Sequence, residues 1–189
     1  ASLIVSKITP GQEYNAILQI FSNSVGGTVN LGVHVTASQV INNDIKIAGI
    51  VTDAEYNQNT NIMAICTKSP NSLIIYNTST KTSRTLDLAM TPNCISISED
   101  GHKAAIGYSV ANISYVDLDA GSILKDVSIN YVPFDIVIGD NSWCYVTPTT
   151  GQWVAFTNVN LQSGQVVRCN NIYRTYERTI IKKVPGQPY

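Results

Sequence analysis

The stretch PNCISISEDGHKAAIGYSVANISYVDLDAGSILKDVSI, residues 92–129, contains the pattern that decides the fold. It divides into four short segments, rich in β-branched and aromatic residues, that are separated by clusters of Asp, Asn, Gly and Ser. Apolar residues alternate with polar ones, as at Ile95 and Ile97, and the Asp100-Gly101 pair is a strong hairpin signal. The stretch therefore predicts one antiparallel sheet of four strands.

The same order of strands and turns recurs before and after this stretch. Three turn positions repeat at intervals of 40 to 43 residues. The first turn falls at Asn57, Asp100 and Asp140, the second at Asn71, Asn112 and Gln152, and the third at Asn77, Asp117 and Asn160. Four-stranded units repeating every ~40 residues are typical of a β-propeller. We therefore predict an all-β fold, with blades at about 47–88, 89–129 and 130–169 and an incomplete blade at 170–189.

Composition restricts the classes of function. Only 13% of the 189 residues are charged and the net charge is −1, which provides no general attraction to nucleic acid. No run of 18 apolar residues is present to span a bilayer. A surface rich in Asn, Ser and Thr is common in extracellular β proteins, so we expect a secreted or cell-surface protein. Because Ala1 begins directly in a strand-like segment, we expect any signal peptide to be absent or removed.

Residues 1–41 differ from the repeats that follow. They read as three strands with turns at Pro10-Gly11 and Gly26-Gly27, about half of an immunoglobulin-like sandwich. The segment PGQEYNAILQIFSNSVGGTVNLGVHVTA, residues 10–37, resembles the last strands of BACON-type sandwich domains in secreted Bacteroidetes proteins. The resemblance implies that 1–41 is the C-terminal part of such a domain.

Two segments of the second repeat resemble the YVTN-type and WD-type propeller repeats of bacterial surface proteins. They are SISEDGHKAAIGY, with its Ser-x-Asp-Gly hairpin, and ISYVDLDAGSIL, in which a strand ends at Asp117 and Gly121 follows four residues later. Propellers close with about four to eight blades, so three blades and a fragment would leave sheet edges open. We therefore expect a piece of a longer protein, with its remaining blades, another chain or another copy covering these edges.

Carboxylates are the strongest candidates for chemistry in the predicted central channel. Asp53 and Glu55 share one face of a first strand, and Asp135 takes a similar place in the third blade. They are suited to hydrogen bonds with neighbouring blades, or to a hard cation such as calcium. The second blade interrupts the acidic ring with Cys94 and Ser96. We therefore predict no metal, no cofactor and no catalytic residue.

Other reactive side chains occur without suitable partners. Residues 107–111, GYSVA, superficially resemble the G-x-S-x-G nucleophile elbow, but a strand rather than a helix is expected to follow. His34 and His102 have no second histidine at ligand spacing. The cysteines, which form no CxxC pair, are expected to be small buried hydrophobes: Cys66, Cys94, Cys144 and Cys169. The basic tail is interpreted as a solvated strand face, not a nucleic-acid site.

A ligand surface is predicted where the second turns and the loops between blades meet. Its candidates are aromatic and amide side chains: Asn71, Tyr108, Asn112, Tyr131, Gln152 and Trp153. Aromatic rings stack on sugars and amides bond hydroxyl groups or peptide backbone, although tryptophans in blades also pack between sheets.

Three functions remain open. The favoured one is a non-catalytic recognition or adhesion module of a secreted or surface protein, with a glycan or a surface protein as its partner. One alternative is a lactonase-like hydrolase whose channel site is completed by missing blades. The other is a structural spacer.

Overall fold

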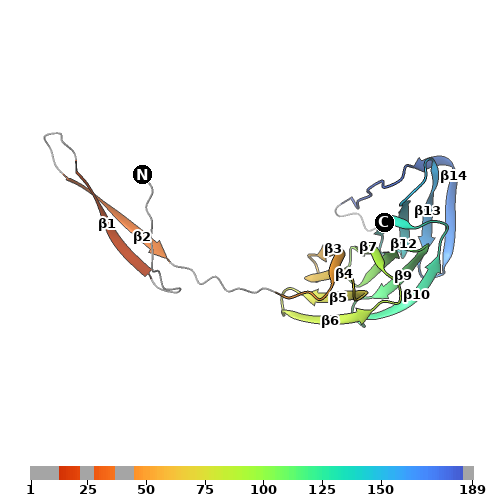
Figure 1. The fold of residues 1–189 in the computed structure, drawn as a ribbon, viewed down its shortest axis with the longest axis horizontal. Helices are drawn as coiled ribbons and strands as arrows, with labels where there is room; N and C mark the ends of the chain where they lie inside the picture. Colours follow the sequence, from red (N-terminus) through yellow and green to blue (C-terminus); the bar gives the residue numbers. More distant parts are fainter. Residues whose placement is uncertain (1–12, 22–27, 37–44, 185–189) are drawn as a thin grey trace. The chain divides into compact units, whose positions relative to one another are not determined.

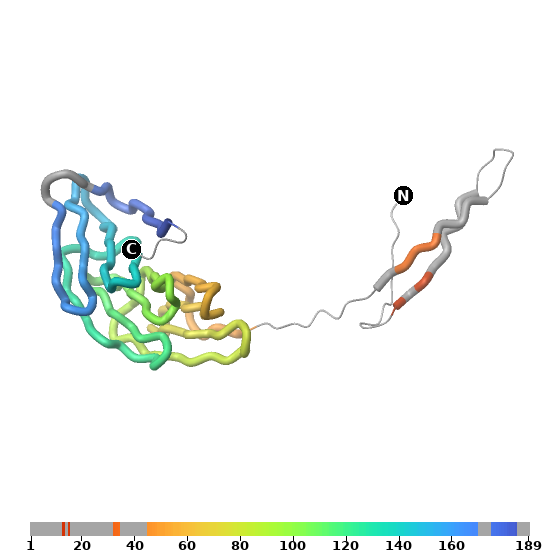
Figure 2. The backbone as a smooth tube through the Cα atoms, turned by 180° about the vertical axis from the view of Figure 1, so that it is seen from behind, coloured from red at the N-terminus to blue at the C-terminus, as the bar shows by residue number. Residues whose placement is uncertain are grey.

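The computed structural model describes residues 13–21, 28–36 and 45–184 of the chain (Figures 1 and 2). The chain divides into two compact units, residues 1–46 and residues 47–189. Among the described residues, there is no helix long and apolar enough to span a membrane.

In the first unit, two antiparallel strands form a hairpin. Strand β1 (Glu13–Phe21) pairs with β2 (Thr28–Thr36) in a continuous register from Glu13↔Thr36 to Phe21↔Thr28. The predicted strand before β1 and both predicted turns lie outside the described residues. The assignment to an immunoglobulin-like or BACON-type sandwich therefore stays a prediction.

The second unit consists of three four-stranded antiparallel sheets, each formed by four strands that are consecutive in the chain. Blade 1 contains β3 (Ile50–Asn57), β4 (Ile62–Lys68), β5 (Ser72–Asn77) and β6 (Thr82–Asp87). Blade 2 contains β7 (Pro92–Ile97), β8 (Lys103–Tyr108), β9 (Asn112–Asp117) and β10 (Ser122–Ser128). Blade 3 contains β11 (Pro133–Ile138), β12 (Trp143–Pro148), β13 (Val154–Asn160) and β14 (Gln165–Thr175). The predicted all-β partial propeller is confirmed.

The three blades follow one another in an arc within this unit. Figure 1 shows β6, β10 and β14 along the outer rim, with the first strand of each blade on the inner side. Two apolar layers fill the spaces between successive blades. One contains Leu73 and Ile75 of blade 1 with Ile97 and Ile106 of blade 2, and the other joins blade 2 to blade 3. Packing between blades therefore buries apolar side chains that a single sheet would leave exposed to water.

The turn residues act through their side chains. The Oδ1 atoms of Asn77, Asp117 and Asn160 accept the backbone N–H of Thr80, Ala120 and Ser163 at 2.9, 2.8 and 2.8 Å. Side-chain acceptance of a backbone N–H three residues later closes the turn locally. The recurring Asn and Asp positions in the sequence therefore correspond to one repeated turn geometry.

The end of blade 3 differs from the prediction. Strand β14 continues to Thr175, so the predicted blade boundary at residue 169 falls inside it. The register shift explains the difference, because Phe156 pairs with Cys169 whereas its neighbour Ala155 pairs with Arg174. A bulge of this kind adds residues to one strand only. Its position depends on the partner strand, so the sequence of β14 alone does not reveal where the strand ends.

Candidate functional site

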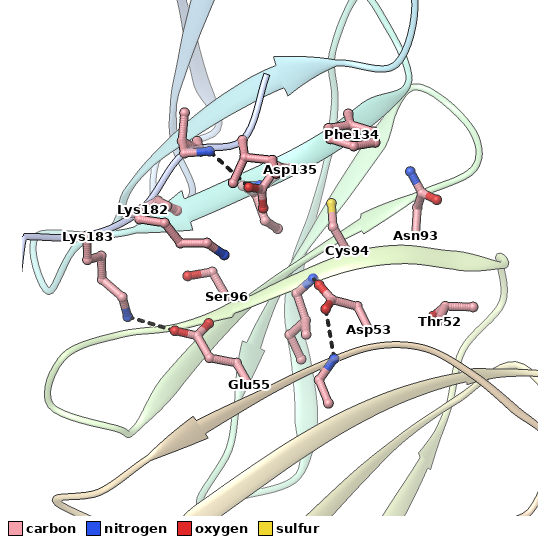
Figure 3. A pocket seen from close by; sticks show the side chains of 16 residues that line it. Thr52, Asp53, Glu55, Asn93, Cys94, Ser96, Phe134, Asp135, Lys182 and Lys183 are labelled. Atoms are coloured by element: carbon pink, nitrogen blue, oxygen red, sulfur yellow. Dashed lines mark hydrogen bonds and ion pairs between the residues drawn. The ribbon is translucent and has the colours of Figure 1, made fainter. Parts of the chain in front are cut away.

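The inner strands surround a cavity of about 520 Å³ that opens to solvent. Strands β3, β7 and β11 line it on one side, and residues 180–183 line it on the other (Figure 3). Figure 2 shows the chain after β14 running back along the inner side of the arc. The predicted channel carboxylates Asp53, Glu55 and Asp135 all lie in this cavity.

The two carboxylates of blade 1 accept hydrogen bonds from the backbone of blade 2. Oδ2 of Asp53 accepts the N–H of Ile95 at 2.9 Å, and Oε2 of Glu55 accepts the N–H of Ile97 at 2.6 Å. Each bond joins residues 42 positions apart. A carboxylate satisfies an otherwise unpaired N–H of the next inner strand, so these side chains connect blades, as predicted.

Blade 2 makes the corresponding link to blade 3 with a hydroxyl group. Oγ of Ser96 accepts the N–H of Ile138 at 3.3 Å, again over 42 positions. Cys94 occupies the place that Asp53 holds in blade 1, because each pairs with the matching residue of its second strand. Burial raises the pKa of the Cys94 thiol well above its usual value, with smaller contributions from nearby acidic groups. This position is therefore neutral.

Blade 3 directs its carboxylate to the C-terminal segment. Oδ2 of Asp135 accepts the N–H of Ile181 at 3.0 Å (Figure 3). Nζ of Lys183 lies 3.2 Å from Oε1 of Glu55 and also donates to the carbonyl of Ile97. Residues 180–183 are thus held at both sides of the cavity, by blade 3 and by the boundary between blades 1 and 2.

The side chains of the cavity were also compared with the requirements of a metal site. Among the described residues, no three His, Cys, Asp or Glu side chains converge as a metal site would. Burial raises the pKa of the Cys66 and Cys144 thiols, which keeps them protonated and poorly nucleophilic at neutral pH. These two and Cys94 are buried free thiols, as predicted, whereas Cys169 is half-buried.

The elbow-like segment and the two histidines are also accounted for. Strand β9, not a helix, follows Ser109, whose N–H bonds the carbonyl of Thr91 at 2.9 Å. Nδ1 of His102 lies 2.8 Å from Oδ2 of Asp119 in an exposed pair. Nδ1 of His34 lies 2.7 Å from Oδ1 of Asn15 in the hairpin. Neither Ser109 nor His102 lines the cavity.

Tyr108, a predicted ligand contact, lies inside the core. Its side chain is 1% exposed in the layer between blades 1 and 2, and its hydroxyl lies 2.6 Å from Oγ of Ser114. Desolvation raises the pKa of Tyr108 to about 12, and the Ser114 hydrogen bond partly opposes this shift. In this position the ring packs between blades and does not reach the loop surface.

Three further candidates are partly buried. The Tyr131 hydroxyl donates to the carbonyl of Val146 at 2.8 Å, and burial raises its pKa. Asn112 is half-buried, and its Oδ1 has no hydrogen-bond partner in the part of the chain that the structure describes. Asn71 is half-buried, and its carbonyl accepts the N–H of Leu88 at 3.0 Å. Ligand contact by these residues stays a prediction.

Trp153 and Gln152 are exposed on the loop between β12 and β13. Trp153 is 58% exposed, and its ring centroid lies 5.0 Å from that of Tyr176, which is 52% exposed. Oε2 of Glu177 accepts the N–H of Gly151 at 3.3 Å and ties the two loops together. Tyr176 was not among the candidates, because the sequence placed it in the basic tail. No local pattern in the sequence marks Tyr176 as the neighbour of Trp153, because the contact depends on the pairing of β13 with β14.

Comparisons with known proteins identify the fold. No model of a known protein family matches the chain, and no curated protein matches it. Among solved structures, hydrazine synthase of Kuenenia stuttgartiensis is similar, with a TM-score of 0.57, 16% identity, and coverage of 69% of this chain and 38% of that one. The β-propeller domain of Cps50 (Swd1) from Myceliophteria thermophila is similar with a TM-score of 0.57 and 15% identity, and the match covers 67% of this chain and 40% of that one. The WD40 repeats of RRP9 are similar with a TM-score of 0.55 and 13% identity, and the match covers 65% of this chain and 39% of that one.

The chain spans about two fifths of the length of the solved chains it matches. Identities this low show the fold alone. Together with the three consecutive four-stranded sheets, they show that the second unit has the fold of a partial β-propeller.

Proposed function

We propose that the chain is a non-catalytic recognition or adhesion module whose ligand surface contains Trp153, Tyr176 and Gln152. The non-catalytic part of the proposal rests on the hydrogen bonds that the inner carboxylates make within the fold. Asp53, Glu55 and Asp135 each accept a backbone N–H of the next inner strand or segment. A general acid or base needs a carboxyl group free to exchange a proton with substrate, and these three are engaged in holding the fold.

The exposed loop pair supports a recognition role. Trp153 and Tyr176, each more than half exposed, lie in contact with each other, and Gln152, which precedes Trp153 in the chain, is also exposed. Rings of this kind stack on the apolar face of a sugar, and amides bond its hydroxyl groups. Loops held by a rigid sheet scaffold are common sites of binding. A glycan on another surface macromolecule fits this chemistry.

The proposal includes a secreted or cell-surface location. Its support is the Asn-, Ser- and Thr-rich composition with only 13% charged residues, and the resemblance of residues 10–37 to BACON-type strands. Asn71, Asn112, Tyr131 and Tyr108 belong to the proposed site only as supports of the loops, since they are half-buried or buried.

A glycan array probed with the 189-residue chain tests the proposal. We expect binding to at least one glycan class, and we expect Trp153→Ala to weaken it about tenfold because a stacking ring is lost. Leu124→Ala is the matched control, since Leu124 is 49% exposed on β10 at the outer rim. Binding of a co-purified protein without any glycan would refute the glycan part. Unchanged binding by Trp153→Ala would place the ligand elsewhere.

A further inference from the structure

A separate hollow of about 330 Å³ lies between the loop that joins blade 2 to blade 3 and the last two strands of blade 3, β13 and β14. Its volume is at the lower end of the range of ~300–1,000 Å³ that is usual for ligand pockets. None of its lining residues lines the inner cavity, so it is a different site. We call it the Arg168 pocket, and its lining residues are Asn130, Tyr131, Val154, Ala155, Thr157 and Arg168.

Arg168 ends a cross-strand row of side chains that recurs at the same register in each blade. The third-strand and fourth-strand members of this row are Ile74 and Thr85 in blade 1, Ser114 and Asp126 in blade 2, and Thr157 and Arg168 in blade 3. In blade 2 the two polar members satisfy each other, because the Ser114 hydroxyl donates to the carboxylate of Asp126. Blade 3 has a cation where blade 2 has that carboxylate.

The charge of Arg168 has no counter-charge within the described part of the chain. Arg168 is exposed on β14, and no acceptor among the described residues forms an ion pair or a hydrogen bond with its guanidinium. Two other cations of fourth strands are engaged: Arg84 donates to the carbonyl of Leu118 at 2.8 Å, and Lys125 donates to that of Gln162 at 2.9 Å. The guanidinium donors of Arg168 are therefore available to a planar anion.

A buried hydroxyl group lies beside this cation. Thr157 is 0% exposed, and its Oγ1 donates to the carbonyl of Ala155 at 3.4 Å, which is long for a hydroxyl hydrogen bond. Buried hydroxyls usually have a well-placed partner, so an oxygen of a ligand would complete the bonding of Thr157.

Tyr131 forms a neutral wall of the pocket. Its hydroxyl donates to the carbonyl of Val146 at 2.8 Å, so its proton is engaged and its oxygen remains an acceptor. Burial raises the pKa of Tyr131, and Thr157 and the positive charge of Arg168 lower it by smaller amounts. The phenol is thus uncharged at neutral pH and does not neutralise Arg168.

Val154 and Ala155 supply a half-buried apolar part of the pocket. Ala155 borders the register shift between β13 and β14, and bulges often lie next to binding sites because they redirect side chains. Val154 directly follows Trp153, and it pairs with the residue that directly precedes Tyr176. The pocket and the exposed ring pair therefore begin at neighbouring residues of both strands.

We propose that the Arg168 pocket binds the carboxylate-bearing sugar of an acidic glycan whose next unit stacks on Trp153 and Tyr176. The proposal rests on the glycan recognition proposed above and names the charge class of its ligand. The guanidinium of Arg168 holds the carboxylate with two parallel hydrogen bonds. The Thr157 hydroxyl bonds a further oxygen of the sugar, and the small apolar wall contacts its C–H groups.

A carboxylate fits this pocket better than a phosphate or sulfate group does. Arg168 is the one cation among the described residues that line it. Phosphate sites commonly add several backbone N–H groups from a helix N-terminus or a nest of successive amides. The walls here are a loop and two paired strands, whose backbone groups bond each other along the ladder.

A titration of the ¹⁵N-labelled 189-residue chain followed by NMR tests the inference. The probes are glucuronate, glucose as its neutral counterpart, acetate and inorganic phosphate, all at the same ionic strength. We expect glucuronate to shift the Arg168 Nε–H and Thr157 amide signals in a saturable way, with an affinity at least about tenfold higher than that of the other three probes.

Variants of the cation separate its geometry from its charge. Arg168→Gln should weaken glucuronate binding about tenfold or more, and Arg168→Lys should restore only part of it, because an ammonium group lacks the planar fork. Lys68→Gln is the matched control, since Lys68 is an exposed cation at the end of β4, and it should leave the affinity unchanged. On a glycan array, acidic glycans should be preferred to their carboxyl-reduced counterparts.

The outcomes distinguish this inference from the proposed function. Trp153-dependent binding of neutral glycans without a glucuronate response at Arg168 would overturn the inference and leave the proposed function standing. A selective, Arg168-dependent response to glucuronate that Trp153→Ala does not change would support the pocket and count against the ring pair. Equal responses to acetate and glucuronate, or a stronger response to phosphate, would overturn the assignment to an acidic sugar.

Discussion

Replacement of Asp53 by alanine tests whether the inner carboxylates hold the blades together. Oδ2 of Asp53 accepts the N–H of Ile95, a residue that is 4% exposed. Removal of the carboxylate leaves that N–H without its protein acceptor in the wall of the cavity. An unsatisfied buried donor costs about 1–3 kcal/mol, and the charged acceptor favours the upper part of that range. We therefore expect Asp53→Ala to lower the free energy of unfolding by about 2 kcal/mol.

Chemical denaturation followed by tryptophan fluorescence and circular dichroism measures this change, provided that the m-value stays constant. Asp53→Asn should lose less than half as much, because its amide oxygen still accepts the Ile95 N–H. Asp87→Ala is the matched control, since Asp87 is an exposed carboxylate at the end of β6, and its effect should stay within about 0.5 kcal/mol. Equal losses for Asp53→Ala and Asp87→Ala would refute the reasoning.

Three further predictions concern the core, a close approach and a turn. Leu73→Ala should cost about 2–5 kcal/mol in denaturant unfolding, because Leu73 is 0% exposed between blades 1 and 2. Gly107→Ala should lower the melting temperature by several degrees, since a Cβ there would lie 2.6 Å from Sγ of Cys94. The Ala120 N–H and the Lys103 ammonium hold the pKa of Asp117 below its usual 3.8, so its stabilising contribution is present above pH 3.8 and is lost as pH falls through the lowered pKa. Asp117→Asn should keep the turn, because Asn77 closes the same turn in blade 1. The free energy of unfolding of this variant should therefore fall less at acidic pH than that of the original protein.

Local chemistry explains why the repeats were predictable. Asn77, Asp117 and Asn160 close the same turn in three blades with their own side chains, so their spacing was visible without tertiary information. The alternation of Ile95 and Ile97 likewise follows from strand geometry alone. The end of blade 3 was missed because the bulge in β14 depends on its pairing with β13.

The candidate ligand surface was predicted less completely. Tyr108 ends a strand beside a turn, and only the neighbouring blade decides that its ring is covered. Tyr176 follows Trp153 by more than twenty residues, and the pairing of β13 with β14 brings the two rings together. Burial and long-range pairing of this kind leave no local pattern in the chain.

The sequence by itself determined the all-β class, the period of about 40 residues and the turn positions, because alternation and turn chemistry act between near neighbours. It also indicated that Asp53, Glu55 and Asp135 face the inner cavity. Only the tertiary structure decided which backbone N–H each inner carboxylate accepts, and that Asp135 reaches Ile181. Those bonds join residues 42 or 46 positions apart, and they form only when apolar faces pack and bring successive inner strands within hydrogen-bond distance.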